Sequence, residues 1–179
     1  MSAAAAFAAW LGAALIVLSE GRRGLAVGMA LVTAGFATLA LAAGQVEGAA
    51  ALVAGGVIAV VQRLRSGSDT WGVMPSGSTA RVVLAAAVGL LALWISTSVM
   101  TGPGASVRFA ALSVLGLTAA RVLTPSEPPA ALTALAALAL SVAVASGVAG
   151  TAPGPAVYVL SAIVAGGLSL IRVRDIHGA

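Results

Sequence analysis

Several side chains that carry much of protein chemistry are scarce here, because the 179-residue chain has no cysteine, no lysine and one histidine. Without cysteine there are no disulfides and no thiolate nucleophiles or metal ligands, and the redox compartment cannot be inferred from cysteine usage. Without lysine there is no Schiff base for retinal. The one histidine, His177, lies in the tail RVRDIHGA, where we expect a solvated side chain rather than a ligand of haem or chlorophyll. We therefore expect no cofactor, no metal site and no catalytic residues.

Charge is also scarce, and this decides the class of protein. Charged residues make up 8% of the chain, hydrophobic residues make up 60%, and the mean hydropathy is +1.11. A soluble domain carries about 25% charged residues. With a third of that, the exterior must face lipid, so the sequence predicts an integral membrane protein with almost no extramembrane mass.

Seven apolar runs approach the roughly 20 helical residues that cross a hydrocarbon core about 30 Å thick. The runs are continuous and separated by breaks rich in Gly and Pro, without the alternation of barrel strands. We predict an all-α integral membrane protein, a bundle of about seven transmembrane helices in one polytopic domain over residues 1–179. The run 47–62 is the shortest, and there are six spans if it does not cross. The predicted spans are approximately 3–19, 24–43, 47–62, 82–100, 105–123, 129–149 and 155–171.

The placement of arginine predicts the orientation of the bundle. The first apolar run lacks the preceding positive charge of a secretory signal, so we expect it to be retained as the first span. With the N-terminus outside and the C-terminus cytoplasmic, Arg108 is the one arginine on the outer side. This bias follows the positive-inside rule and predicts a multi-pass protein of the bacterial inner membrane. The arginines on the cytoplasmic side are Arg22, Arg23, Arg63, Arg65, Arg81, Arg121, Arg172 and Arg174.

The stretch QRLRSGSDTWGVMPSGSTAR, residues 62–81, is the longest polar segment, and it predicts a cytoplasmic loop over 63–81. It has neither the GxGxxG nor the GK[ST] pattern of a nucleotide-binding loop. Its centre is an apolar island with a tryptophan, a residue that suits the head-group level of a membrane. We interpret the segment first as a linker and second as a docking surface for a partner. The candidate partner or lipid contacts are Arg63, Arg65, Trp71, Met74 and Arg81.

Arg108 lies in the first turn of the run 105–123, near the outer face. Two interpretations are open: it binds an anionic lipid head group, a substrate carboxylate or an acidic partner residue, or it extends to the interface as long cationic side chains do. The second is the simpler. The nine basic residues are scattered between apolar runs rather than clustered, so nucleic acid is not an expected partner.

Small residues are the strongest positive signal in the apolar runs. They let helix backbones approach closely, which replaces the hydrophobic drive that lipid cannot supply. The pattern predicts close packing, either within the chain or against another protein. The candidate packing positions are Gly24, Gly28, Gly55, Gly56, Gly166 and Gly167.

No ionisable residue lies near the centre of a predicted span, and groups at that depth are usually functional. A proton relay or an intramembrane enzyme is therefore not expected. The sequence predicts a non-catalytic structural or accessory subunit of a larger integral membrane complex, such as a respiratory or other energy-transducing one, with lipid and other integral membrane subunits as partners. The alternative is a small transporter or channel with a three-plus-one-plus-three helix arrangement. That arrangement resembles the SWEET sugar transporters in topology alone, because their Pro-Gln signature is absent from these spans.

Overall fold

The computed structural model of the protein describes residues 2–65, 79–98, 104–124, 128–148 and 154–171. Within these ranges there are seven α-helices and no strands, which confirms the predicted all-α class. The helices are α1 (Ser2–Leu18), α2 (Arg22–Ala42), α3 (Val46–Arg65), α4 (Thr79–Ser98), α5 (Ala105–Leu123), α6 (Pro128–Val148) and α7 (Pro155–Leu170).

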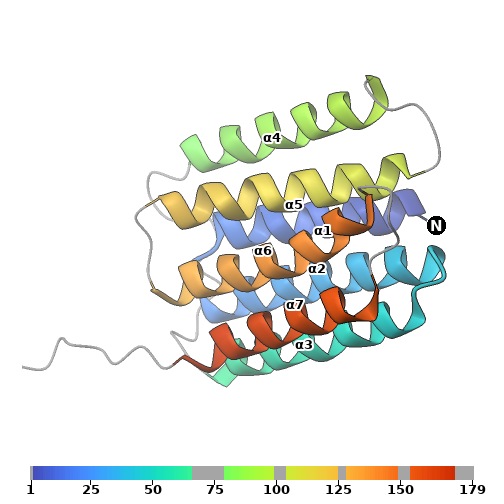
Figure 1. Ribbon diagram of the computed structural model, residues 1–179. Coiled ribbons are helices and arrows are strands. Elements are labelled where there is room, and N and C mark those ends of the chain that lie inside the picture. Colours follow the sequence, from blue (N-terminus) through green and yellow to red (C-terminus); the bar gives the residue numbers. More distant parts are fainter. Residues whose placement is uncertain (1, 66–78, 99–103, 125–127, 149–153, 172–179) are drawn as a thin grey trace, which may run out of the picture.

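Six of the helices form two rows of three, and α4 lies outside both (Figure 1). In one row α2 lies between α1 and α3, and in the other α6 lies between α5 and α7. The rows pack face to face, with α1 against α5, α2 against α6 and α3 against α7. The core therefore runs between the rows, along α2 and α6.

The Ala-rich α6 is the most enclosed helix of its row, and it contacts α1, α2, α3, α5 and α7. Ala130, Ala134, Ala137 and Leu140 are fully buried, and Ala is small enough to let the neighbouring backbones approach. The small side chains of α6 thus allow it to pack among five neighbouring helices.

Four of the described helices are long and apolar enough to cross a membrane: α2, α3, α5 and α6. The remaining apolar helical stretches are shorter by this measure, with 17 residues in Ser2–Leu18, 17 in Thr79–Ile95 of α4, where the side chains are described, and 16 in Pro155–Leu170. The four long helices support the assignment as a membrane protein.

The structure corrects the bounds of the third predicted span. We predicted the shortest run at 47–62, but α3 has 20 residues and α7, with 16, is the shortest helix described. The helix continues because Arg63 turns inward and is buried, while the exposed Arg65 lies in the last turn, where a cation interacts favourably with the helix dipole.

The predicted loop 63–81 is correspondingly too long. Its ends are helical, with Arg63 and Arg65 in α3 and Arg81 in the first turn of α4. Trp71 and Met74, the centre of the predicted docking surface, lie outside the described residues.

Consecutive helices run antiparallel, which gathers most of the described arginines at one end of the bundle (Figure 1). Arg108, in the first turn of α5, lies at the opposite end. We call the first of these the basic end, defined by Arg22, Arg23, Arg63, Arg65, Arg81 and Arg121.

Candidate functional site: a charge cluster and the packing surfaces

Three charged side chains from separate helices meet at the basic end. Glu20 follows the end of α1, Arg81 lies at the start of α4 and Arg121 lies in the last turn of α5. The Arg81 Nη1 atom donates to Glu20 Oε1 at 2.8 Å, and Arg121 Nη2 lies 3.7 Å from the same oxygen. One carboxylate therefore links the ends of three helices.

Burial differs sharply within this cluster. The Arg121 side chain is 0% exposed, whereas Arg81 and Glu20 retain 24% and 27%. Arg121 Nη2 also lies 3.5 Å from the Ser19 carbonyl oxygen. A buried guanidinium needs a counter-charge because water no longer solvates it. Glu20 supplies that charge, so the cluster joins α4 and α5 to the end of α1.

Arg63 is the second buried arginine at the basic end. It is 4% exposed, and its Nε and Nη2 atoms have no hydrogen-bond partner within the described part of the chain. It belongs to α3, which contacts α2, α6 and α7 but lies in the row position farthest from α4 and α5. Arg63 and Arg65 therefore do not join the cluster around Glu20, whereas Arg81, another predicted contact, does.

Arg108 is half-buried in the first turn of α5, after Gly104. Gly104 has a φ of +101°, a left-handed conformation that favours glycine, and its backbone lies beside the Arg108 guanidinium. Arg108 lies at the opposite end of the bundle from the cluster around Glu20.

The predicted packing glycines fall into distinct environments. A Cβ added to Gly28 would lie 2.8 Å from the Gly12 carbonyl oxygen, and one added to Gly55 would lie 2.7 Å from the Ala162 Cα. At Gly56 an added Cβ would overlap the Thr33 side chain. These three positions lie where α2 meets α1, α3 meets α7 and α3 meets α2.

Two other predicted positions are less constrained. A Cβ on Gly166 would make ordinary contact with Ile58 at 3.6 Å, and Gly167 faces open space. Gly24 is buried in α2. Gly55–Gly56 and Gly166–Gly167 share the sequence VAGG, yet the second glycine is enclosed in α3 and open in α7.

Sequence patterns alone did not single out several close contacts. Gly12 faces Gly28, Gly35 faces Ala5 and Ala9, and Gly89 faces Trp10. Each is a lone glycine whose partner lies on another helix, so no GxxxG spacing within one helix marks it. The pairing of Glu20 with arginine has a sequence signal, since both fall at the predicted cytoplasmic ends of spans.

The hydroxyl groups in the interior are used for local bonding. Most donate to a carbonyl oxygen three or four residues back in their own helix, as Ser and Thr commonly do in spans. Ser161 is different, because its hydroxyl donates from α7 to the Ala139 carbonyl of α6 at 2.5 Å. The locally bonded buried hydroxyls are those of Thr33, Ser113, Thr118, Thr133, Ser141 and Ser169.

No group of three or more His, Asp or Glu side chains that would hold a metal ion occurs among the described residues. Comparison with protein families gives no matching model, and comparisons with curated proteins and with solved structures give no significant match. The described residues form a helical bundle with ion pairs at one end, and four of its helices are long and apolar enough to cross a membrane.

Proposed function

We propose that this chain is a non-catalytic structural subunit of a larger integral membrane complex. The observation that carries the proposal is the closed packing between the two rows of helices. Large side chains from both rows are fully buried there, and the hydroxyls among them bond backbone carbonyls rather than facing a path for solute. The fully buried large side chains include Met29, Phe36, Val114, Leu117 and Leu140.

The outer helices supply surface for neighbouring subunits. On α4, Val83, Leu90, Leu91 and Trp94 are each more than half exposed. Among the described helices, α4 contacts α5 and α1, so its remaining face is open to lipid or to the spans of another protein as far as the described residues extend. In a complex, we place the partner against α4.

For localisation we propose the bacterial inner membrane, with the helices as seven spans and the basic end in the cytoplasm. Arginine on the cytoplasmic side is favoured because translocation of positive charge is unfavourable. Arg22, Arg23, Arg65 and Arg81 all lie at this end, and the assignment also places the N-terminus outside.

Site-specific photo-crosslinking in intact membranes tests the proposed role. A photoreactive residue at Val83 or Leu91, on the exposed face of α4, should crosslink to a different membrane protein. The matched control is Ala137 on α6, which is fully buried and should crosslink only within the chain. Crosslinks from α4 to lipid alone, or only to copies of this chain, would contradict the proposal.

The transporter is the second candidate, because two rows of three helices with α4 outside them match the helix count of a three-plus-one-plus-three arrangement. The pairing of the rows counts against such repeats. Parallel repeats related by a twofold axis along the membrane normal would place α1 opposite α7, whereas α1 packs against α5. Arg108→Ala separates the two functions. An anion transporter that uses this side chain should lose uptake in reconstituted vesicles, whereas assembly of a structural subunit should be unaffected.

A further inference from the structure

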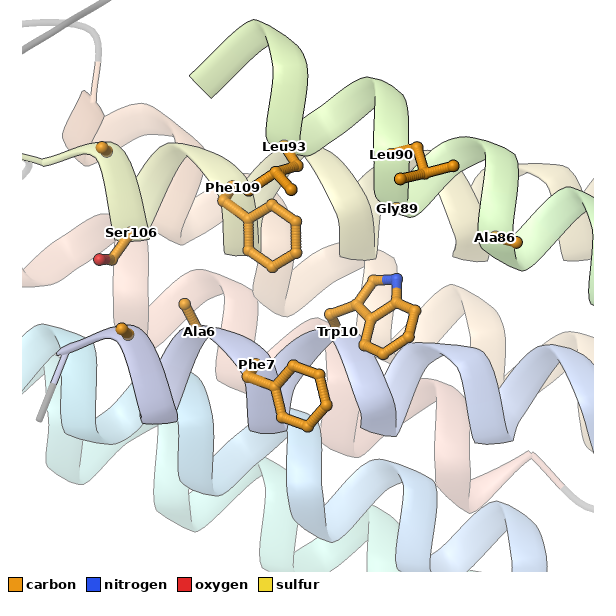
Figure 2. Close-up of a pocket in the computed structure, with 11 residues that line it drawn as sticks. Ala6, Phe7, Trp10, Ala86, Gly89, Leu90, Leu93, Ser106 and Phe109 are labelled. Carbon is orange, nitrogen blue, oxygen red and sulfur yellow. The ribbon is translucent and has the colours of Figure 1, made fainter. Parts of the chain in front are cut away.

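We propose that the cavity between α1, α4 and α5 binds a single hydrocarbon chain of a membrane lipid. This inference goes beyond the structural role and does not depend on it. The cavity has a volume of about 610 Å³, within the range of roughly 300–1,000 Å³ common for ligand sites. Figure 2 shows the side chains around it, with Phe7 and Trp10 on α1, Leu90 and Leu93 on α4 and Phe109 on α5.

The walls are hydrocarbon almost throughout. Apart from aromatic and aliphatic carbon, the lining side chains offer the Ser106 hydroxyl and the indole N–H of Trp10. The indole nitrogen is buried against Gly89, where an added Cβ would lie 2.5 Å from it. A water molecule needs two to four polar partners to be held in such a space. The wall chemistry therefore fits an apolar chain rather than water, an ion or a polar solute.

The long axis of the cavity follows the helices. On α1 the lining extends from Ala3 to Trp10 and on α4 from Ala86 to Leu93, about 10 Å in each case at 1.5 Å per residue. It begins at the end opposite the basic end, beside Ala105 at the start of α5, and reaches the middle of α4. Half of a hydrocarbon core about 30 Å thick has a similar depth, so a chain of the adjacent leaflet would lie along the groove.

The width of the cavity also favours a lipid chain over a helix of another protein as its occupant. A helix with its side chains is about 10–12 Å wide, and its insertion would require α4 to move away from α1. The contact between Gly89 and the Trp10 ring opposes that movement, because it brings the α4 backbone directly against α1. Trp10 in turn packs on Phe7, with ring centroids 5.3 Å apart. These contacts hold α4 against α1 and leave room for one slender chain.

Quenching of Trp10 fluorescence by brominated lipid tests the proposal. Trp71→Phe and Trp94→Phe leave Trp10 as the one tryptophan, and the protein is reconstituted in vesicles of phosphatidylcholine with a dibrominated stearoyl chain. Ala86→Phe fills the groove from its wall. Ala87→Phe is the matched control, since Ala87 is equally exposed on α4 but does not line the cavity. We expect quenching to fall at least twofold in Ala86→Phe and to be unchanged in Ala87→Phe.

Equal quenching in the two variants would overturn the proposal, as would the absence of quenching in the parent protein. Circular dichroism checks that each variant is helical, and Ala3→Phe, at the mouth of the groove, provides a second blocking variant. Native mass spectrometry then identifies the chain. The proposal is supported if one lipid per protein is retained in Ala87→Phe and lost in Ala86→Phe. The mass of that lipid shows whether the bound chain belongs to a phospholipid or to a prenyl lipid. Equal retention in both variants would contradict it.

Discussion

Gly12 of α1 and Gly28 of α2 face one another so closely that neither position has room for a side chain. A Cβ on Gly12 would lie 2.5 Å from the Gly28 carbonyl oxygen, and a Cβ on Gly28 would lie 2.8 Å from the Gly12 carbonyl oxygen. Near the start of α1, Gly35 approaches the Ala5 carbonyl in the same way. The helices α1 and α2 therefore touch through their backbones, which is how small residues hold spans together in lipid.

Gly12→Ala and Gly28→Ala should each lower the stability of the folded protein by about 1–3 kcal/mol, the usual cost of overpacking. The obstructing atoms are mainly backbone, so they have little freedom to move aside. Because both substitutions force apart one contact, the double variant should cost less than the sum of the two single changes. Thermal unfolding in detergent measures this. Strict additivity, or no loss in either single variant, would contradict the close contact.

The two copies of VAGG offer an internally matched pair. Gly56→Ala should destabilise α3 because the new methyl group would overlap Thr33, while Gly167→Ala enters open space and should leave stability unchanged or raise it by up to about 1 kcal/mol through helix propensity. The difference between the unfolding midpoints of the two variants is the measurement. The same effect at both sites would show that the shared sequence, rather than its surroundings, sets the packing.

The different burial of the three charged side chains in the cluster predicts which substitution lowers stability most. Glu20→Gln removes the counter-charge of the fully buried Arg121 and should cost about 1–3 kcal/mol, the usual penalty for an unsatisfied buried donor. Arg81→Ala removes only the partly exposed pair and should cost less than about 1 kcal/mol. Adding Arg121→Met to Glu20→Gln should restore much of the lost stability. If Arg81→Ala is the more damaging single change, Arg121 does not depend on Glu20.

The absence of cysteine makes the orientation directly testable, because no native thiol has to be removed first. Arg23→Cys lies exposed at the basic end and Ala43→Cys lies exposed at the opposite end. With the basic end in the cytoplasm, a membrane-impermeant maleimide added to intact spheroplasts should label Ala43→Cys and reach Arg23→Cys only after lysis. The reverse pattern would invert the bundle, and labelling of both before lysis would remove the spanning arrangement.

Composition was sufficient to predict a membrane protein, because a surface with so few charges suits lipid rather than water. The runs of apolar residues predicted the position of each described helix to within a few residues. The end of α3 was misplaced because hydropathy alone ends a span at its first arginines. The burial of Arg63 depends on neighbouring helices that are distant in sequence.

The close contacts were harder to predict than the helices. GxxxG spacing marked Gly28, but its partner Gly12 and the pair formed by Gly89 and Trp10 depend on which helices become neighbours. The cavity beside Trp10 depends in the same way on the position of α4, which contacts α5 and α1 among the described helices. Local sequence carries little information on such pairings, since lipid and protein neighbours are equally apolar.

The mass of the particle released from the membrane by a mild detergent tests the central claim most directly. Native mass spectrometry of the tagged protein should show it together with one or more different integral membrane subunits in fixed stoichiometry. A lone chain, or an assembly of identical chains that carries out solute flux after reconstitution, would contradict a structural role and favour a transporter.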